Sequence, residues 1–112
     1  MAKRRAKPAP RAAQARGDVI STAHIERYLK ITERAITAVK VAPPARSHHR
    51  RLAEDFLDMA KAYSGDARHF KDKGDFVNAL SCVNYAHGWL DAGARLGLFD
   101  VGGDDQLFTL AE

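Results

Sequence analysis

The sequence has a single cysteine among its 112 residues, and this scarcity excludes a disulfide framework or a zinc site built from cysteines. Long apolar runs are also missing, since none approaches the roughly 18 residues that a membrane-spanning helix needs. The N-terminus is basic but lacks the apolar stretch of a secretory signal. A chain of this length has room for one domain. We therefore expect a cytoplasmic protein with no membrane partner.

The net positive charge is confined to one end of the chain. Residues 1–17 carry six basic residues and no acidic one, a charge of +6. The whole chain has 18 basic and 14 acidic residues, so residues 18–112 have 12 and 14, a net charge of −2. The net charge of +4 therefore comes from the tail alone. Its basic residues are Lys3, Arg4, Arg5, Lys7, Arg11 and Arg16.

The composition of this tail predicts a disordered basic arm over residues 1–19, followed by a helical domain over residues 20–112. Pro8 and Pro10 interrupt the arm, and no large apolar residue follows Met1 to offset the entropy cost of ordering. Two interpretations remain open. The arm is either a solubilising extension or a segment that follows a phosphate backbone and gains affinity by releasing counterions.

Three helices are predicted from their local start and stop signals. The expected N-caps, which accept a hydrogen bond from the free N–H groups of the first turn, are Ser21 or Thr22, Ser47 and Asp75. Pro43 and Pro44 end the first helix because proline lacks the N–H donor and clashes with the preceding turn. Gly74 and Gly97 end the other two, since glycine adopts positive φ freely.

Apolar residues recur at steps of three and four within each segment, which places them on one face of each helix. The first stripe is Ile25, Leu29, Thr32, Ile36 and Val39, and the second is Leu52, Phe56, Met59, Tyr63, Ala67 and Phe70, widened by Ala53, Leu57 and Ala60. The third helix has two such stripes, so we expect it to contact both neighbours and to be the most buried. Its small residues, among them Ala79, Ala86 and Gly93, favour close approach of another helix.

No strand pattern of convincing length is present. The sequence therefore predicts an all-α fold, an up-down-up three-helix bundle with short connections. After Gly97 we expect Leu98 or Phe99 to fold back onto the helix. Residues 106–112 are expected to form a short helical turn that docks through Leu107, Phe108 and Leu110.

A basic cluster lies at the expected start of the second helix. It consists of Arg46, Arg50 and Arg51, with His48 and His49 between them. Three arginines at a helix N-terminus are unfavourable against the helix dipole, and a phosphate among them would relieve this. The alternative is a solvated surface cluster. Adjacent histidines point in different directions on a helix, so this pair is not expected to bind a metal.

A polar cluster on the third helix consists of Asn84, His87, Asp91 and Arg95, each within one turn of the next. His87 stands on an apolar stripe, which favours a core histidine held by a hydrogen bond over a catalyst. Asp91, four residues on, is placed to fix its tautomer. Catalysis would also need a nucleophile or a bound substrate, and the sequence names neither. We assign no catalytic residue, no metal and no cofactor.

The stretch from Lys73 to Val101, KGDFVNALSCVNYAHGWLDAGARLGLFDV, resembles a small archaeal family known as domain of unknown function 357. The segments EDFLDMAKAY, starting at Glu54, and ERYL, starting at Glu26, resemble it too. The resemblance covers about residues 22–112 and implies a compact helical bundle without an assigned activity. There is a weaker resemblance to helical nucleases of the HEPN type. Those carry an arginine that is followed by a histidine after a gap of four to six residues, and none of the five histidines here has an arginine at that distance.

Two classes of function follow. The first is a non-enzymatic binding module whose basic tail and Arg46–Arg51 cluster contact RNA or ribonucleoprotein. The second is a protein-interaction or self-assembly module, a homo-oligomer or one with a protein partner. It would use the third helix and the Leu98–Phe99 region. An enzymatic role built on His87 ranks behind both.

Overall fold

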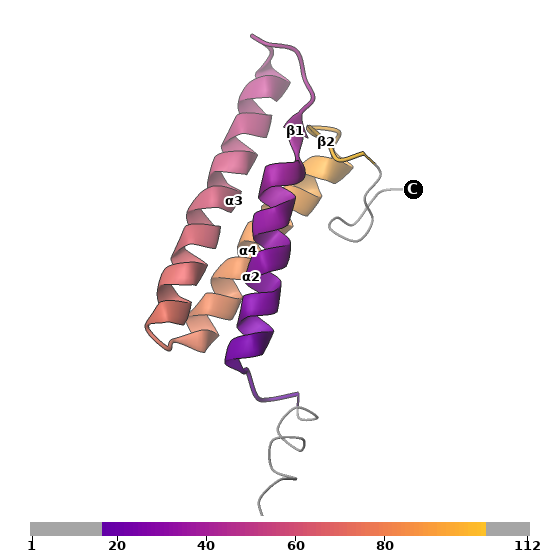
Figure 1. The fold of residues 1–112 in the computed structure, drawn as a ribbon. Coiled ribbons are helices and arrows are strands. Elements are labelled where there is room, and N and C mark those ends of the chain that lie inside the picture. Colours follow the sequence, from indigo (N-terminus) through magenta and orange to yellow (C-terminus); the bar gives the residue numbers. More distant parts are fainter. Residues whose placement is uncertain (1–16, 103–112) are drawn as a thin grey trace, which may run out of the picture.

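The computed structural model describes residues 17–102, which form three helices and a two-stranded ladder (Figure 1). The helices are α2 (Thr22–Ala38), α3 (His48–Asp72) and α4 (Phe76–Arg95), and the strands are β1 (Lys40–Val41) and β2 (Phe99–Asp100). The helices lie side by side, and the chain direction alternates from each to the next. The all-α fold with three helices is thus confirmed. Among the residues that the structure describes, no helix combines the length and apolarity needed to cross a bilayer.

Two predicted features fall outside the described residues. They are the basic arm, of which residues 1–16 are not described, and the helical turn expected over residues 106–112. The division of the chain into a tail and a domain at residue 19 stays a prediction.

Each helix begins where the sequence predicts it. Ser21, Ser47 and Asp75 each accept a hydrogen bond from the backbone N–H three residues on, at 3.0, 3.0 and 3.2 Å. Of the two candidates for the first cap, the structure uses Ser21, and Thr22 is the first helical residue. Because each cap satisfies a donor that has no partner within its helix, these residues fix the starts of all three helices.

The end of α4 is a Schellman motif. Gly97 has a φ of +79°, the Gly97 N–H donates to the carbonyl of Ala94 at 3.2 Å, and the Leu98 N–H donates to that of Gly93 at 2.9 Å. Leu98 and Phe99 are only 2% and 4% exposed. The expected fold-back of these two residues onto the helix is therefore confirmed.

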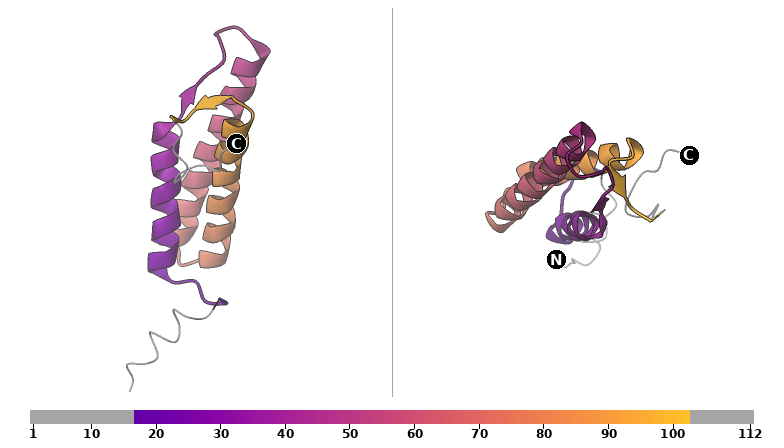
Figure 2. Two further views of the ribbon diagram at one scale, coloured as in Figure 1. Left: turned by 90° about the vertical axis from the view of Figure 1, so that its right-hand side faces the viewer. Right: turned by 90° about the horizontal axis from the view of Figure 1, so that it is seen from above.

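The sequence pattern did not reveal the short two-stranded ladder that the structure contains. Helix α2 ends at Ala38, well before the prolines, and β1 then pairs antiparallel with β2 (Figure 2). Lys40 lies opposite Asp100 and Val41 opposite Phe99. A two-residue ladder is too short to produce the alternating pattern by which strands are recognised in a sequence. It nevertheless joins the α2–α3 connection to the chain that leaves α4.

Small side chains occupy buried positions at the same spacing on α3 and α4. Ala53, Ala60 and Ala67 on α3, seven residues apart, are fully buried. The residues at the same spacing on α4 are Ala79, Ala86 and Gly93, and all three are buried. The larger residues of the predicted α3 stripe, such as Phe56, are half-buried instead. The buried face of α3 is therefore centred on its alanines and not on its larger apolar residues, because alanine lets two helices approach closely.

Helix α2 is held against α3 by a cluster of charges. The Arg68 guanidinium donates to the carboxylates of Glu26 and Glu33 at 2.8 and 3.0 Å. The Lys71 ammonium lies 3.0 Å from Glu26 as well. The hydrogen bonds from Lys71 and Arg68 lower the pKa of the Glu26 carboxyl below its ordinary value. These pairs join one side of α2 to the C-terminal half of α3.

We expect the packing at the C-terminal end of α4 to require glycine at position 93. A Cβ atom built on it would overlap the ring of Phe99. We predict that Gly93→Ala lowers the free energy of unfolding by about 1–3 kcal/mol, because either the ring or the backbone must move.

Gly65 provides the matched control, since it is an exposed residue of α3 and a Cβ there meets nothing within 4 Å. Gly65→Ala is expected to raise stability by up to about 1 kcal/mol, through helix propensity alone. Urea denaturation of both variants measures the difference. Equal effects of the two substitutions would contradict the packing of Phe99 on Gly93.

Candidate functional site

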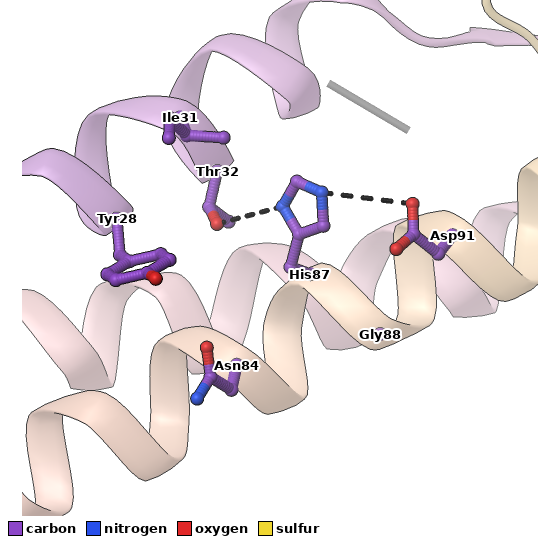
Figure 3. A pocket seen from close by; sticks show the side chains of 7 residues that line it. All are labelled: Tyr28, Ile31, Thr32, Asn84, His87, Gly88 and Asp91. Atoms are coloured by element: carbon purple, nitrogen blue, oxygen red, sulfur yellow. Dashed lines mark hydrogen bonds and ion pairs between the residues drawn. The ribbon is translucent and has the colours of Figure 1, made fainter. Parts of the chain in front are cut away.

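A pocket of about 390 Å³ opens between α2 and α4 (Figure 3). Its lining residues are Tyr28, Ile31, Thr32, Asn84, His87, Gly88 and Asp91. On each helix these positions are three or four residues apart, so helical geometry alone brings them to one face. The pocket exists because those two faces meet along the middle of the bundle.

His87 lies at the centre of the polar groups in this pocket. Its Nδ1 atom is 3.0 Å from the hydroxyl of Thr32, a buried residue of α2. Its Nε2 atom points toward Asp91, with 3.8 Å to the nearer carboxylate oxygen (Figure 3). Such an arrangement favours the tautomer that carries its hydrogen on Nε2, toward the carboxylate, while Nδ1 accepts from the Thr32 hydroxyl.

The structure brings together three of the four residues of the predicted polar cluster. Asn84, His87 and Asp91 line the pocket, whereas Arg95 lies one turn further along α4, is exposed and is not among the lining residues. Thr32 was predicted only as part of an apolar stripe. A hydroxyl within such a stripe is a signal that a buried polar partner exists. Its spacing cannot identify that partner, which lies 55 residues away in the sequence.

The geometry fits a structural histidine better than a catalyst. One ring nitrogen is engaged by Thr32, and the distance from the other to Asp91 is longer than a hydrogen bond. Among the described residues, no group of three or more His, Cys, Asp or Glu side chains is placed to hold a metal ion. The pocket presents the polar groups of Thr32, His87 and Asp91 next to the apolar and aromatic side chains of Ile31 and Tyr28.

An aromatic surface borders this pocket on α4. A second hollow of about 280 Å³ is lined by Asn84, Tyr85, Gly88, Trp89 and Ala92. The ring of Tyr85 lies edge-on to that of Tyr63 at 4.6 Å between centroids, and Trp89 lies edge-on to Phe56 at 4.9 Å. Asn84 and the exposed Gly88 line both hollows, so the two are neighbours on α4.

Cys82 is half-buried on α4. Burial, followed by the negative charges of Asp66 and Asp75, raises the pKa of its thiol above the ordinary value. The thiol therefore stays protonated at neutral pH, which makes it a poor nucleophile.

The basic cluster at the start of α3 is partly used within the fold. Arg50 donates to Glu54 at 3.3 Å and to the carbonyl of Pro43 at 3.1 Å. Arg51 lies 3.5 Å from the Nδ1 atom of His48. Arg46 is exposed and has a φ of +69°, a left-handed conformation uncommon for arginine.

The basic cluster lies far from the residue at which the described chain begins. The described chain begins at residue 17 beside the start of α2, at one end of the bundle, and the connection to α3 that contains Arg46 lies at the other end (Figure 1). With 25 residues, α3 separates these ends by about 37 Å at 1.5 Å per residue. The six basic residues of the tail, Lys3, Arg4, Arg5, Lys7, Arg11 and Arg16, lie outside the described residues. A single compact basic surface is therefore not formed within the described part of the chain.

Comparison with known proteins yields one family. A family model described as "Protein of unknown function (DUF357)" matches residues 27–99. The matched range contains all residues of the His87 pocket and most of the bundle, and it leaves out the basic tail. Neither the comparison with curated proteins nor that with solved structures found a match.

The contact between Thr32 and His87 generates a prediction about the imidazole. We expect ¹⁵N NMR to show neutral His87 with its hydrogen on Nε2. Thr32→Val should lower the free energy of unfolding by about 1 kcal/mol, since it leaves Nδ1 without its donor. Thr37→Val is the matched control, because its exposed hydroxyl bonds only to a carbonyl of its own helix. Hydrogen on Nδ1, with the Thr32 substitution neutral, would contradict this arrangement.

Proposed function

The chain belongs to the DUF357 family, and from that premise we propose that it is a non-enzymatic module whose basic N-terminal tail contacts RNA or ribonucleoprotein. The family description assigns no activity, so the proposal is based on this chain's own residues. The observation that carries it is the separation of charge: +6 on residues 1–17 against −2 on the rest. A polyanion is attracted to the first segment and not to the second.

The distribution of the other arginines supports a contact centred on the tail. Arg50 and Arg68 are engaged with carboxylates of the bundle, so their charge is largely compensated. Arg46 and Arg51 remain as a second basic position at the far end of α3. We therefore propose that the tail supplies most of the affinity, with Arg46 and Arg51 secondary.

A protein-interaction role through α4 is the second candidate, and exposed apolar side chains favour it. Val77 and Leu96 are 69% and 66% exposed, and Tyr85 also faces outward. At 100° per residue these three positions fall within about one third of the helix circumference. The Leu98–Phe99 region does not contribute, because both residues are buried in their own chain. The proposed contact surface therefore contains Leu96 and not Leu98 or Phe99.

The RNA proposal is tested by binding of a fluorescent single-stranded RNA to the full chain at two salt concentrations. Six phosphate contacts predict that log K falls against log salt with a slope of about −4. A variant with all six basic tail residues changed to glutamine should lose most of the affinity and of this slope.

The matched control carries Arg46→Gln and Arg51→Gln, which change charge at the opposite end of the bundle. We expect it to lose far less affinity than the tail variant. Equal affinity of the tail variant and the unaltered chain would refute the proposal. Equal loss in the two variants would refute the dominance of the tail.

The second candidate predicts self-association through α4. Sedimentation of the full chain should then show a concentration-dependent dimer, and Leu96→Glu should return it to a monomer because a buried charge opposes the contact. Val19→Glu, also at an exposed apolar residue but outside α4, should leave the dimer intact. A strict monomer at all concentrations would exclude this form of the hypothesis.

A further inference from the structure

The exposed face of α4 carries almost no charge. Every exposed residue of this helix from Val77 to Ala92 is uncharged. By contrast, the exposed positions of α3 carry Glu54, Asp58 and Lys61, among other charges. A helix that faces only water normally has charged residues opposite its buried side, whereas the centre of a protein contact is depleted of them. The face of α4 therefore has the character of a contact surface.

A protruding ring and an open position lie next to each other at the middle of this face. Tyr85 is 49% exposed, and Gly88, three residues on, is exposed as well. A Cβ atom built on Gly88 meets nothing within 4 Å. Both residues line the hollow of about 280 Å³ on α4. The surface thus offers an aromatic ring and, less than one helical turn away, space for another.

The large and small residues of the face match those of a second α4 that runs in the opposite direction. Consider a two-fold axis that crosses the helix between positions 86 and 87. Three pairs of residues then lie level with each other across the two copies: Tyr85 with Gly88, Ser81 with Ala92, and Val77 with Leu96. Each pair occurs twice, because a two-fold interface uses the same surface on both sides. Ser81 and Ala92 also fall at nearly the same angle around the helix, so small residues meet near the centre.

Charge selects the antiparallel direction. The face is bracketed by Asp75, the N-cap of α4, and by Arg95 in its last turn. Parallel copies would bring each of these residues beside its own equivalent, which is a repulsive contact. In the antiparallel register Arg95 lies level with Asn78 of the second copy. The Asn78 amide donates to the Asp75 carboxylate at 2.6 Å, so Arg95 comes within about one turn of an opposite charge.

We propose that two copies of this chain form an antiparallel dimer through α4, with the exposed edge of each Tyr85 ring against Gly88 of the other copy. The inference rests on the second candidate function, self-association through α4, and adds to it the direction, the register and the central contact. One helix face is smaller than a stable interface of about 1,200–2,000 Å². The dimer is therefore reversible and depends on concentration.

Cysteine cross-linking tests the register in the full chain. In a Cys82→Ala background, Ser81→Cys and Ala92→Cys are made as two separate variants, both at exposed positions. A disulfide requires Cα atoms within about 7 Å. In the proposed register position 81 meets position 92, whereas two copies of position 81 are at least about 16 Å apart. We expect an equal mixture of the two variants to form disulfide-linked dimers at least tenfold faster than either variant alone.

The control is a mixture of Ala92→Cys with Asp58→Cys, an exposed residue of α3, which gives the rate of random collision. Faster cross-linking of each single variant with itself would overturn the proposed register and leave self-association through α4 intact. Equal rates in all mixtures would also overturn the register. A strict monomer in sedimentation would refute the candidate function and this inference together.

Asn78 offers a second measurement with a matched pair of variants. It is exposed and lies level with Arg95 of the second copy in the proposed register. Asn78→Glu should therefore lower the Kd of the dimer, and Asn78→Lys should raise it. We expect shifts of about two- to tenfold at low salt, because the surface pair occurs twice, and smaller shifts at high salt. Shifts in the same direction, or none, measured by sedimentation, would overturn the register.

Discussion

The close contact between α3 and α4 is the constraint on which the rest of the fold depends. Ala53, Ala60 and Ala67, seven residues apart on α3, are all buried, and so are Ala79, Ala86 and Gly93 on α4. Because small side chains occupy the centre of this contact, the larger side chains lie at its edges. Those on one edge pack against α2, and those on the other edge form the aromatic surface around Trp89. The same need for a small residue holds at Gly93 near the end of α4. Because glycine has no side chain, the ring of Phe99 packs directly against its backbone.

Features set by local chemistry were predictable from the sequence. The caps at Ser21, Ser47 and Asp75 and the glycine stop at Gly97 depend on neighbours within a few residues, so they can be read without a fold. The burial of α3 could not be read in this way, because leucine, phenylalanine and alanine are all apolar. Which of them faces α4 is decided by how closely two helices approach. The β1–β2 ladder joins positions about 60 residues apart and is too short to leave a pattern.

The candidate site shows the same division. Helical spacing grouped Asn84, His87 and Asp91 correctly on one face of α4, and it extended the group to Arg95, one turn beyond the pocket. The hydrogen-bond partner of His87 is Thr32 on α2, and the position of α2 does not depend on the sequence of α4 alone. Arg68 holds α2 to α3, and the Thr32–His87 hydrogen bond joins it to α4. The site is therefore a product of how α2 docks, and no single segment contains it.

The net charge of +4 conceals three segments of the chain that differ in charge. Residues 18–112 have a net charge of −2, and the last ten residues carry −3, so residues 18–102 carry +1. The helical bundle is close to neutral, and each terminus has its own sign. The chain enters at one end of the bundle and leaves β2 near the other. Any long-range electrostatic attraction to a charged molecule therefore depends mainly on the termini, because the bundle between them has almost no net charge.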